Sequence, residues 1–407
     1  MVPNGWVVLK LEDLEGGDRP VVKAGPFGSS LKKEFYTESG YKIYGQEQVI
    51  AGDAFIGDYY IDYEKYSSLK SCAVEPGDIL ISLVGTIGKV LLIPDNAQPG
   101  IINPRLLRIS LNKDQMSSVF FKYFLESQPT VNRLTSLAQG GTMGVLNAAT
   151  LKSLKIPVPP LPEQQKIAKI LTTWDKAIDT TERLIDNSKQ QKKALMQQLL
   201  TGKKRLFDDN GKPFEGEWEK VKLSDIANIS MGSSPKSAAY NDEGIGLPLL
   251  QGNADIKNRK SAPRIYTSQI TRECQIGDIL LSVRAPVGTV ALSEHHACIG
   301  RGISSIRAKK KHSQDFLYQL MLDFEPRWRA FSQGSTFEAV NSNDIKSLSL
   351  NVPNFEEQQK IAAVLTNADK EIELLEQQLA DLQQEKKALM QQLLTGKKRV
   401  VVDGEVV

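Results

Sequence analysis

The sequence predicts an α+β protein in which two pseudo-symmetric α/β domains are separated by a long antiparallel two-helix coiled coil. The first observation is a repeat, because residues 192–205 recur letter for letter as residues 386–399, 194 positions later. The second is a lead-in segment, residues 163–168, which recurs at the same distance as residues 357–362. The third is a heptad pattern that follows the lead-in and continues into the repeat. A long repeat with one constant spacing indicates two related halves, each ending in a long helix.

Length and composition suit a large globular protein. A chain of 407 residues is too long for one ordinary core, so two to four domains are expected. Its 41% hydrophobic and 24% charged residues are typical of globular chains, and no apolar run reaches the roughly 18 residues that a membrane helix needs. The three cysteines are scattered, which favours a reducing compartment over disulfides or a zinc site. We therefore expect a cytoplasmic protein, whose net charge of +3 neither demands nor excludes nucleic acid.

The first domain is expected over residues 1–160. A helix is predicted at residues 117–126, where apolar side chains recur at helical spacing. Two of the apolar runs are joined by a short glycine-containing loop, which predicts a β-hairpin. The runs that predict strands are residues 6–11, 77–84, 88–93 and 154–158.

A central helix is expected within residues 161–205 and a distal helix within residues 355–399. Pro162 suits the first turn of a helix, because that position needs no amide donor. Gly202 provides a C-terminal stop for the central helix.

The second domain is expected over residues 206–354, beginning with a turn-rich linker, and residues 400–407 form a C-terminal tail. Four segments of the first half are echoed in the second half in the same order, with offsets that shrink from 212 to 194. We expect the halves to share a fold and to differ by loop insertions, mostly in the first. The echoed pairs are residues 6–14 and 218–226, 28–30 and 232–234, 77–82 and 277–282, and 139–142 and 333–336.

The distal helix carries a heptad seam, with steps of three and four residues that are the signature of a coiled coil. Its seam is Ile372, Leu375, Leu379, Leu382, Lys386, Leu389 and Leu393. The equivalent positions of the central helix are more polar and comprise Ile178, Thr181, Ile185, Ser188, Lys192, Leu195 and Leu199. Two such helices in one chain most easily pair antiparallel, as a rod of about 57 Å for about 38 residues. The alternative is that each helix packs only on its own domain. Antiparallel pairing would bring the end of the distal helix back to the first domain, so the tail after Arg399 is expected near Trp6.

Several motifs together resemble the DNA-specificity subunit of type I restriction–modification systems. They are GDILIS at residues 77–82, LPEQQKIA at 161–168, LLTGKKR at 199–205 and RAPVG at 284–288. Each motif alone is modest, but the set occurs in order and covers essentially the whole chain.

The resemblance implies a non-catalytic, sequence-specific DNA-binding subunit with two target recognition domains, each reading one half of a bipartite asymmetric site in double-stranded DNA. It implies that the coiled coil sets the spacer length and docks two adenine methyltransferase (modification) subunits, which restriction/translocase subunits join. No cofactor or metal is expected in this subunit. S-adenosylmethionine is expected in the methyltransferase partner, and ATP and Mg in the restriction partner.

Candidate DNA contacts are polar and basic residues of loops in both domains. Hydroxyls and lysines beside glycine suit phosphate, and these are Ser29, Ser30, Lys32, Lys33, Ser233, Ser234 and Lys236. Amide side chains can bind adenine through two hydrogen bonds, and these are Gln46, Gln48, Gln139, Gln251, Asn253 and Gln333, with Thr142 and Thr336 in the same glycine-rich loops as Gln139 and Gln333. For each of them, an ordinary solvated turn is the alternative.

Arginines supply the remaining candidates, because arginine reads guanine as well as phosphate. Arg284 and Arg301 lie beside predicted strands of the second domain, and Arg105 and Arg108 occupy the region of the first domain that corresponds to Arg301. Val84 stands where the second domain has Arg284. This difference suits two halves that read different sequences.

No catalytic motif is apparent, so the chain is not expected to be an enzyme. It lacks the Asp/Asn-Pro-Pro-Tyr/Phe tetrapeptide of amino-methyltransferases, and residues 85–89 are too short for a phosphate-binding loop. Two other functions stay open: a coiled-coil scaffold that joins proteins without reading DNA, and the specificity subunit of a system with fused cleavage and methylation. Two divergent heads argue against a pure scaffold.

Overall fold

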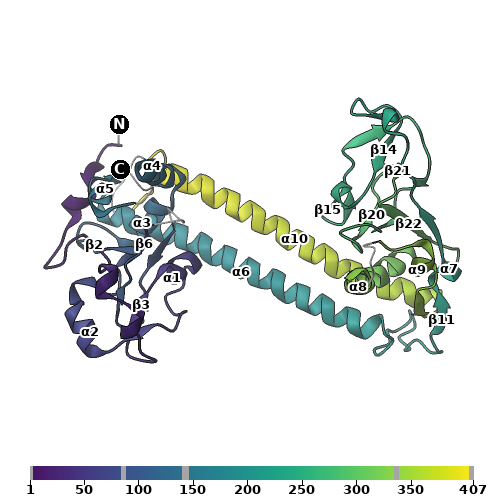
Figure 1. The fold of residues 1–407 in the computed structure, drawn as a ribbon, viewed down its shortest axis with the longest axis horizontal. Coiled ribbons are helices and arrows are strands. Elements are labelled where there is room, and N and C mark those ends of the chain that lie inside the picture. Colours follow the sequence, from purple (N-terminus) through teal and green to yellow (C-terminus); the bar gives the residue numbers. More distant parts are fainter. Residues whose placement is uncertain (1–2, 84–88, 140–145, 334–338, 403–407) are drawn as a thin grey trace. The chain divides into compact units, whose positions relative to one another are not determined.

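The structure is a computed structural model that describes residues 3–83, 89–139, 146–333 and 339–402. It divides into two compact units. Unit 1 comprises Met1–Glu182 and Gln378–Val407, and unit 2 comprises Arg183–Gln377 (Figure 1). Both units are mixtures of helix and sheet, which confirms the predicted fold class.

Unit 1 has two four-stranded sheets among its described residues. In the first, the antiparallel order is β2 (Val22–Ala24), β9 (Leu106–Ile109), β6 (Ile79–Ser82) and β7 (Val90–Leu92). In the second, the order is β4 (Tyr60–Ile61), β3 (Tyr41–Tyr44), β8 (Gly100–Ile102) and β5 (Ala73–Val74). A separate antiparallel pair joins β1 (Val7–Lys10) to β10 (Lys155–Val158). The pairing of β6 with β7 confirms the predicted hairpin.

The helices of unit 1 cover these sheets. They are α1 (Gln46–Ala51), α2 (Tyr63–Ser68), α3 (Ser118–Glu126), α4 (Gln128–Gln139) and α5 (Ala148–Lys152). The Ser117 hydroxyl caps α3 by accepting a hydrogen bond from the Phe120 backbone N–H. The apolar face of α3 joins Ile79 of β6, Ile167 and Leu393 in one buried core. Long-helix residues therefore form part of this core.

Unit 2 repeats this plan with additions. The order of its larger sheet is β12 (Ala227–Met231), β22 (Ile303–Ala308), β19 (Ile279–Ser282), β20 (Val290–Leu292), β16 (Lys260–Ser261) and β15 (Ile256–Lys257). The order of its smaller sheet is β13 (Tyr240–Asn241), β17 (Ile265–Thr267), β14 (Leu247–Leu250), β21 (Ala297–Ile299) and β18 (Glu273–Cys274). A further pair is β11 (Glu219–Lys222) with β23 (Ser349–Val352), and the helices are α7 (Leu223–Ile226), α8 (Gln314–Gln333) and α9 (Ser342–Lys346).

The two units share strand order and register. The order β2-β9-β6-β7 matches β12-β22-β19-β20, and the pairing of Ile79 with Ile109 matches that of Ile279 with Ile306. This confirms the predicted common fold. Insertions occur in both units, since the β15–β16 hairpin extends the larger sheet of unit 2, whereas unit 1 has α1 and α2.

The register corrects one of the predicted echoes. Gly25 N–H donates to Leu106 O at 3.0 Å, and Gly232 N–H donates to Ile303 O at 2.9 Å, where Leu106 and Ile303 are equivalent strand residues. Gly232 therefore corresponds to Gly25 and not to Gly28. In each case the backbone passes so close to a neighbouring carbonyl that a Cβ would lie about 2 Å from it, 1.9 Å for Gly25 and 2.1 Å for Gly232. The pattern of Gly-Ser-Ser letters was misleading, because the glycine is needed at the end of the strand.

The two long helices are α6 (Leu161–Leu199) and α10 (Phe355–Leu393) (Figure 1). Their predicted seam positions are buried or partly buried, whereas most positions between them are exposed. Gly202 and Gly396 both follow the helix ends with a φ of 69°, a left-handed conformation that glycine adopts without steric cost.

Contacts between α6 and α10 run antiparallel within each unit. In unit 1, Lys386 is ion-paired with Asp175, and Arg399 binds Glu163. In unit 2, the counterparts of these residues 194 positions away make the same contacts: Lys192 with Asp369 and Arg205 with Glu357. The helices therefore pair with each other as predicted, and do not pack only on their own domains.

The end of the second repeat lies against the N-terminal segment of unit 1, and Val400 of the predicted tail packs against the core cluster that contains Trp6. Arg399 Nη1 donates to the Asn4 carbonyl at 2.7 Å, and its guanidinium lies 5.9 Å from the Trp6 ring centroid. A Cβ on Gly396 would lie 2.2 Å from Pro3. Pro3, Asn4 and Trp6 thus lie in one packed cluster with Gly396 and Arg399.

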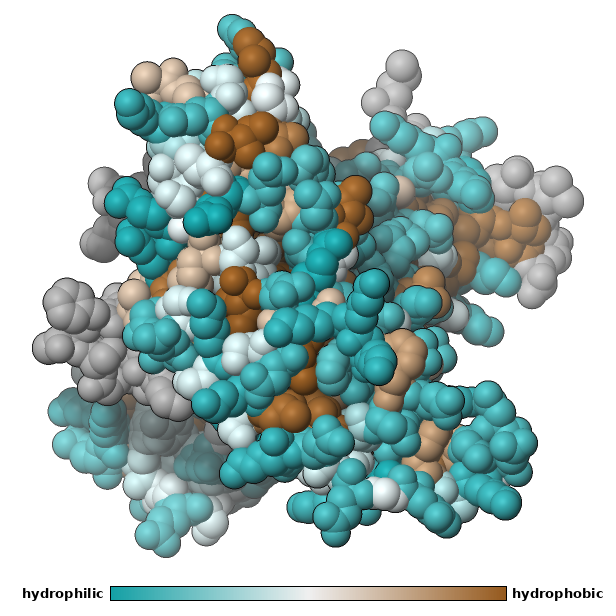
Figure 2. All heavy atoms as spheres, turned by 90° about the vertical axis from the view of Figure 1, so that its right-hand side faces the viewer, coloured by the Kyte–Doolittle hydropathy of each residue, from teal (hydrophilic) through white to brown (hydrophobic). Residues whose placement is uncertain are grey.

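Figure 2 shows a face covered mostly by hydrophilic residues, with apolar residues in small separate groups. Within the described part of the chain, no helix has both the length and the apolar character that crossing a membrane requires.

Candidate nucleic-acid interface

The candidate site of unit 2 begins where two neighbouring parallel strands end. Strands β14 and β21 pair in parallel, with Leu250 opposite Ile299. Gln251 follows the first strand, and the segment 300–302 follows the second. Gly300 N–H donates to Leu250 O at 2.8 Å, and Gly302 N–H donates to Gln251 O at 3.0 Å. The carboxyl ends of parallel strands are a common place for ligands, because loops from several strands meet there.

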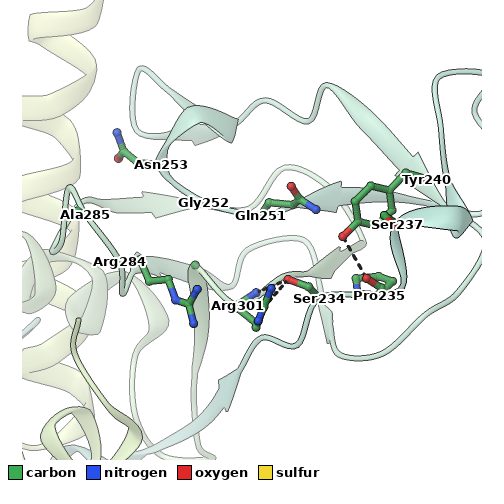
Figure 3. Close-up of a pocket in the computed structure, with 11 residues that line it drawn as sticks. Ser234, Pro235, Ser237, Tyr240, Gln251, Gly252, Asn253, Arg284, Ala285 and Arg301 are labelled. Carbon is green, nitrogen blue, oxygen red and sulfur yellow. Dashed lines mark hydrogen bonds between the residues drawn. The ribbon is translucent and has the colours of Figure 1, made fainter. Parts of the chain in front are cut away.

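Loops from four segments surround a groove of about 760 Å³ at this edge (Figure 3). Five predicted contacts line it: Ser234, Gln251, Asn253, Arg284 and Arg301. The other lining residues are Pro235, Ser237, Tyr240, Gly252, Ala285 and Gly302. The described lining thus combines two arginines, two amides and three hydroxyls, and none of its described residues carries a carboxylate. Such a surface suits a polyanion that carries hydrogen-bonding groups.

Most described arginine side chains of unit 2 are ion-paired, but those of the groove are not. The paired residues are Arg205, Arg259, Arg264, Arg307 and Arg327, with Glu357, Glu325, Asp255, Asp278 and Asp323 respectively. Arg284 and Arg301 are exposed, and neither makes a salt bridge to any carboxylate of the described residues. Their positive charge is therefore available to a ligand.

The loop that carries Arg284 is closed by Ser282. The Ser282 hydroxyl donates to Pro286 O at 2.7 Å and accepts from Thr289 N–H at 3.0 Å. Ser282 is buried, whereas Arg284 is exposed. The loop therefore holds the arginine at the groove while its base is anchored in the sheet.

Sequence reasoning missed Asp255 and Tyr240. Asp255 is 2% exposed and accepts hydrogen bonds from the backbone N–H groups of Gln251, at 2.8 Å, and Gly252, at 3.3 Å. It thereby shapes the loop that presents Gln251 and Asn253. A glycine followed three residues later by aspartate signals such a local cap. Tyr240 lines the groove, and its hydroxyl donates to Pro235 O at 3.1 Å; no sequence signal marked it.

The Asn253 side chain is incompletely bonded. Its Oδ1 is buried and has no hydrogen-bond partner among the described residues. An unsatisfied buried acceptor is costly, so a ligand or solvent donor that reached it would stabilise this loop.

The equivalent edge of unit 1 carries different side chains. Strands β3 and β8 pair in parallel, and Asn103 N–H donates to Tyr44 O at 2.9 Å, as Gly300 does to Leu250. By this register Pro104 stands where unit 2 has Arg301, and Arg105 stands where it has Gly302. Arg105 is exposed at this edge, and Gln46 Nε2 donates to Ser82 Oγ at 2.7 Å.

Two predicted contacts of unit 1 serve its fold and are not available to DNA. Gln48 is 0% exposed, accepts from Gly45 N–H at 2.7 Å and donates to Ile56 O at 3.0 Å. Arg108 is 1% exposed and donates to Ala73 O at 2.6 Å. Burial and the neighbouring charge of Arg19 lower the pKa of Arg108 from its usual value. The prediction that these two side chains contact DNA was therefore wrong.

The remaining candidates lie on the surface or outside the described residues. Ser29 is exposed and Ser30 half-buried in a short 3-10 turn, Lys32 lies 3.5 Å from Glu34, and Lys33, Ser233 and Lys236 are exposed outside the groove lining. Thr142 and Thr336 fall outside the described residues. Gln139 ends α4 and Gln333 ends α8, but their side chains are not described. For these residues DNA contact stays a prediction.

Comparison with known proteins gives one consistent family. A family model described as type I restriction modification DNA specificity domain matches residues 3–189 and 215–384. A relative from Methanocaldococcus jannaschii, described as a type I restriction enzyme MjaX specificity subunit, is 32% identical over 413 residues, covering 98% of this chain and 95% of the relative. The MjaVIII specificity subunit of the same organism is 25% identical over 353 residues, covering 81% of each.

Solved structures agree on the fold. The HsdS subunit from Thermoanaerobacter tengcongensis superposes with a TM-score of 0.53 at 24% identity, covering 98% of both chains. A type I restriction-modification S subunit from M. genitalium gives a TM-score of 0.61 at 17% identity, covering 95% of this chain and 96% of that one.

Proposed function

Because this chain belongs to the family of type I restriction-modification DNA specificity proteins, we propose that it is the non-catalytic subunit whose two units each read one half of a bipartite, asymmetric DNA site. The observation that carries this proposal is the groove of unit 2. There Arg284 and Arg301, which form no salt bridge with the described residues, stand beside Gln251 and Asn253 at the end of two parallel strands. Arginine and amide side chains are the usual readers of base edges.

The difference between the units supports an asymmetric site. The backbone framework is common to both, yet Pro104 replaces Arg301 and Gly45 follows the strand where unit 2 has Gln251. A shared scaffold with different side chains at its ligand edge suits two readers of different base sequences.

The repeated helices suit a common role in both halves. Identical residues make the same α6–α10 contacts in each unit, as in the pairs Asp175–Lys386 and Asp369–Lys192. Two equivalent helix surfaces would dock two methyltransferase subunits, and the helix length would set the spacer between half-sites. S-adenosylmethionine would then be bound by the methyltransferase, and ATP and Mg by a restriction subunit.

Selection from a pool of randomised duplex DNA tests this function. The full chain, alone and with its methyltransferase subunits, would be incubated with the pool, and bound duplexes would be sequenced. We expect two half-sites at one fixed spacing, with affinity falling steeply as salt rises, because phosphate contacts release counterions. Enrichment of no motif in either state would overturn the proposal and favour a scaffold.

A further inference from the structure

Arg301 is held in place by the loop that carries it. It stands between Gly300 and Gly302, and this loop lies close against Gln251 and Ser234. A Cβ on Gly302 would lie 2.2 Å from Gln251 O, and one on Gly300 would lie 3.3 Å from Ser234 Oγ. Arginine is thus the only side chain larger than hydrogen in this three-residue loop, and the backbone on both sides of it is closely packed against neighbouring segments.

Ser234 also orients the guanidinium. Its Oγ accepts hydrogen bonds from the Arg301 backbone N–H at 3.2 Å and from Nε at 3.4 Å (Figure 3). Among the described residues, no acceptor binds Nη1 or Nη2 of Arg301. The two terminal nitrogens therefore remain as a fork whose direction is set by the serine.

We propose that Arg301 reads a guanine in the half-site of unit 2 and that Ser234 is its positioning residue. Guanine presents two adjacent acceptors, O6 and N7, in the major groove, and the arginine fork can bind both at once. This inference rests on the proposed function, because it names a base within the DNA site that unit 2 would read.

Positioning distinguishes a base reader from a phosphate contact. A phosphate accepts hydrogen bonds from many directions, so a flexible arginine suffices for it, whereas two parallel bonds to one base edge need a fixed fork. Arg284 makes no side-chain hydrogen bond to the described residues and suits a phosphate. Arg301 is the arginine of the groove with a fixed direction.

The described residues of unit 1 contain no equivalent of the Arg301–Ser234 pair. The register places Pro104 at the position of Arg301 and Phe27 at that of Ser234, and Phe27 is 88% exposed. Loss of Arg301 should therefore change one half-site and leave the other unchanged. The unaffected half-site serves as a control within the same molecule.

The test compares enriched motifs from randomised duplex DNA for the full chain and its variants. Wild type should enrich a half-site with an invariant guanine. Arg301→Ala should lower the preference for that guanine on the order of 10- to 100-fold, the typical range for one bidentate pair. Arg301→Lys, which keeps the charge and loses the fork, should lower the preference while largely retaining total affinity. Ser234→Ala should lower the preference for guanine at the same position, whereas Ser234→Thr, which keeps the hydroxyl, should preserve this preference.

Arg327→Ala is the matched control, because Arg327 is 63% exposed on α8 and lies outside the groove lining. It should leave both half-sites unchanged. If Arg301→Ala weakened all duplexes equally without altering the motif, Arg301 would be a phosphate contact and the inference would be overturned while the proposed function stood. A wild-type pool without any motif would overturn both.

Discussion

Replacing Arg205 by alanine should destabilise unit 2 more than the matched replacement of Arg399 destabilises unit 1. Both arginines bind a buried glutamate through two hydrogen bonds of 2.7 and 2.8 Å, Arg205 to Glu357 and Arg399 to Glu163. Removing the arginine leaves a buried carboxylate without its counter-charge, which costs roughly 3–5 kcal/mol. The difference between the units lies in what else each carboxylate binds.

Glu163 retains a second donor that Glu357 lacks. Trp6 Nε1 donates to Glu163 Oε2 at 3.0 Å, whereas Nε1 of its counterpart Trp218 has no partner in the described structure. A hydrogen bond to a charged group contributes roughly 1.5–3 kcal/mol. Arg205→Ala should therefore cost about 1.5–2 kcal/mol more than Arg399→Ala. This is the lower end of the range, because both arginine side chains are about a quarter exposed, 26% and 24%.

Amide hydrogen exchange is the suitable assay, because a chain with two units does not unfold in one step. Protection would be measured at the first turns of α10 and α6, where the two glutamates lie. Adding Glu357→Gln to Arg205→Ala should recover part of the loss, since no unpaired charge then remains buried. Equal losses in the two units, or a larger loss for Arg399→Ala, would refute the role given to the Trp6 hydrogen bond.

Three further outcomes are expected. Burial raises the pKa of Tyr44 to about 12. Because the folded value exceeds the unfolded value of about 10, the stability contribution of this tyrosine is fully present below pH 10, and roughly 3 kcal/mol is lost as pH rises through 12. Tyr44→Phe should flatten this fall in urea-denaturation midpoints, and an unchanged pH profile would contradict it. Inserting four residues into both α6 and α10 adds ~6 Å and should lengthen the recognised spacer, whereas an unchanged spacer in a methylation assay would exclude the helices as its ruler. Asp255→Ala should weaken selectivity at the half-site of unit 2 by about tenfold through loss of two backbone hydrogen bonds, with the other half-site unchanged; equal selectivity in the two proteins would show that Asp255 does not support the groove.

The sequence identified several residues that line the groove, but it did not show which of the candidate residues would lie there and which would be buried elsewhere. Gln251, Asn253, Arg284 and Arg301 were recognised as polar residues in loops, and the structure brings them together. Gln48 and Arg108 had the same appearance in sequence, yet both are buried and bonded to backbone groups. Residue type alone cannot distinguish a structural side chain from one that is available to DNA. A buried arginine that donates to a backbone carbonyl and an exposed arginine look the same in the sequence.

The sequence by itself determined the two-fold plan, the antiparallel helices and their seam, because a heptad and a 194-residue repeat are periodic and local signals. Only the tertiary structure decided that Gly232 corresponds to Gly25 and that Ser234 orients Arg301. These relations join segments far apart in the chain through strand register. Such register is fixed only when two strands pair, because a shift of one residue turns every side chain to the other face of the sheet.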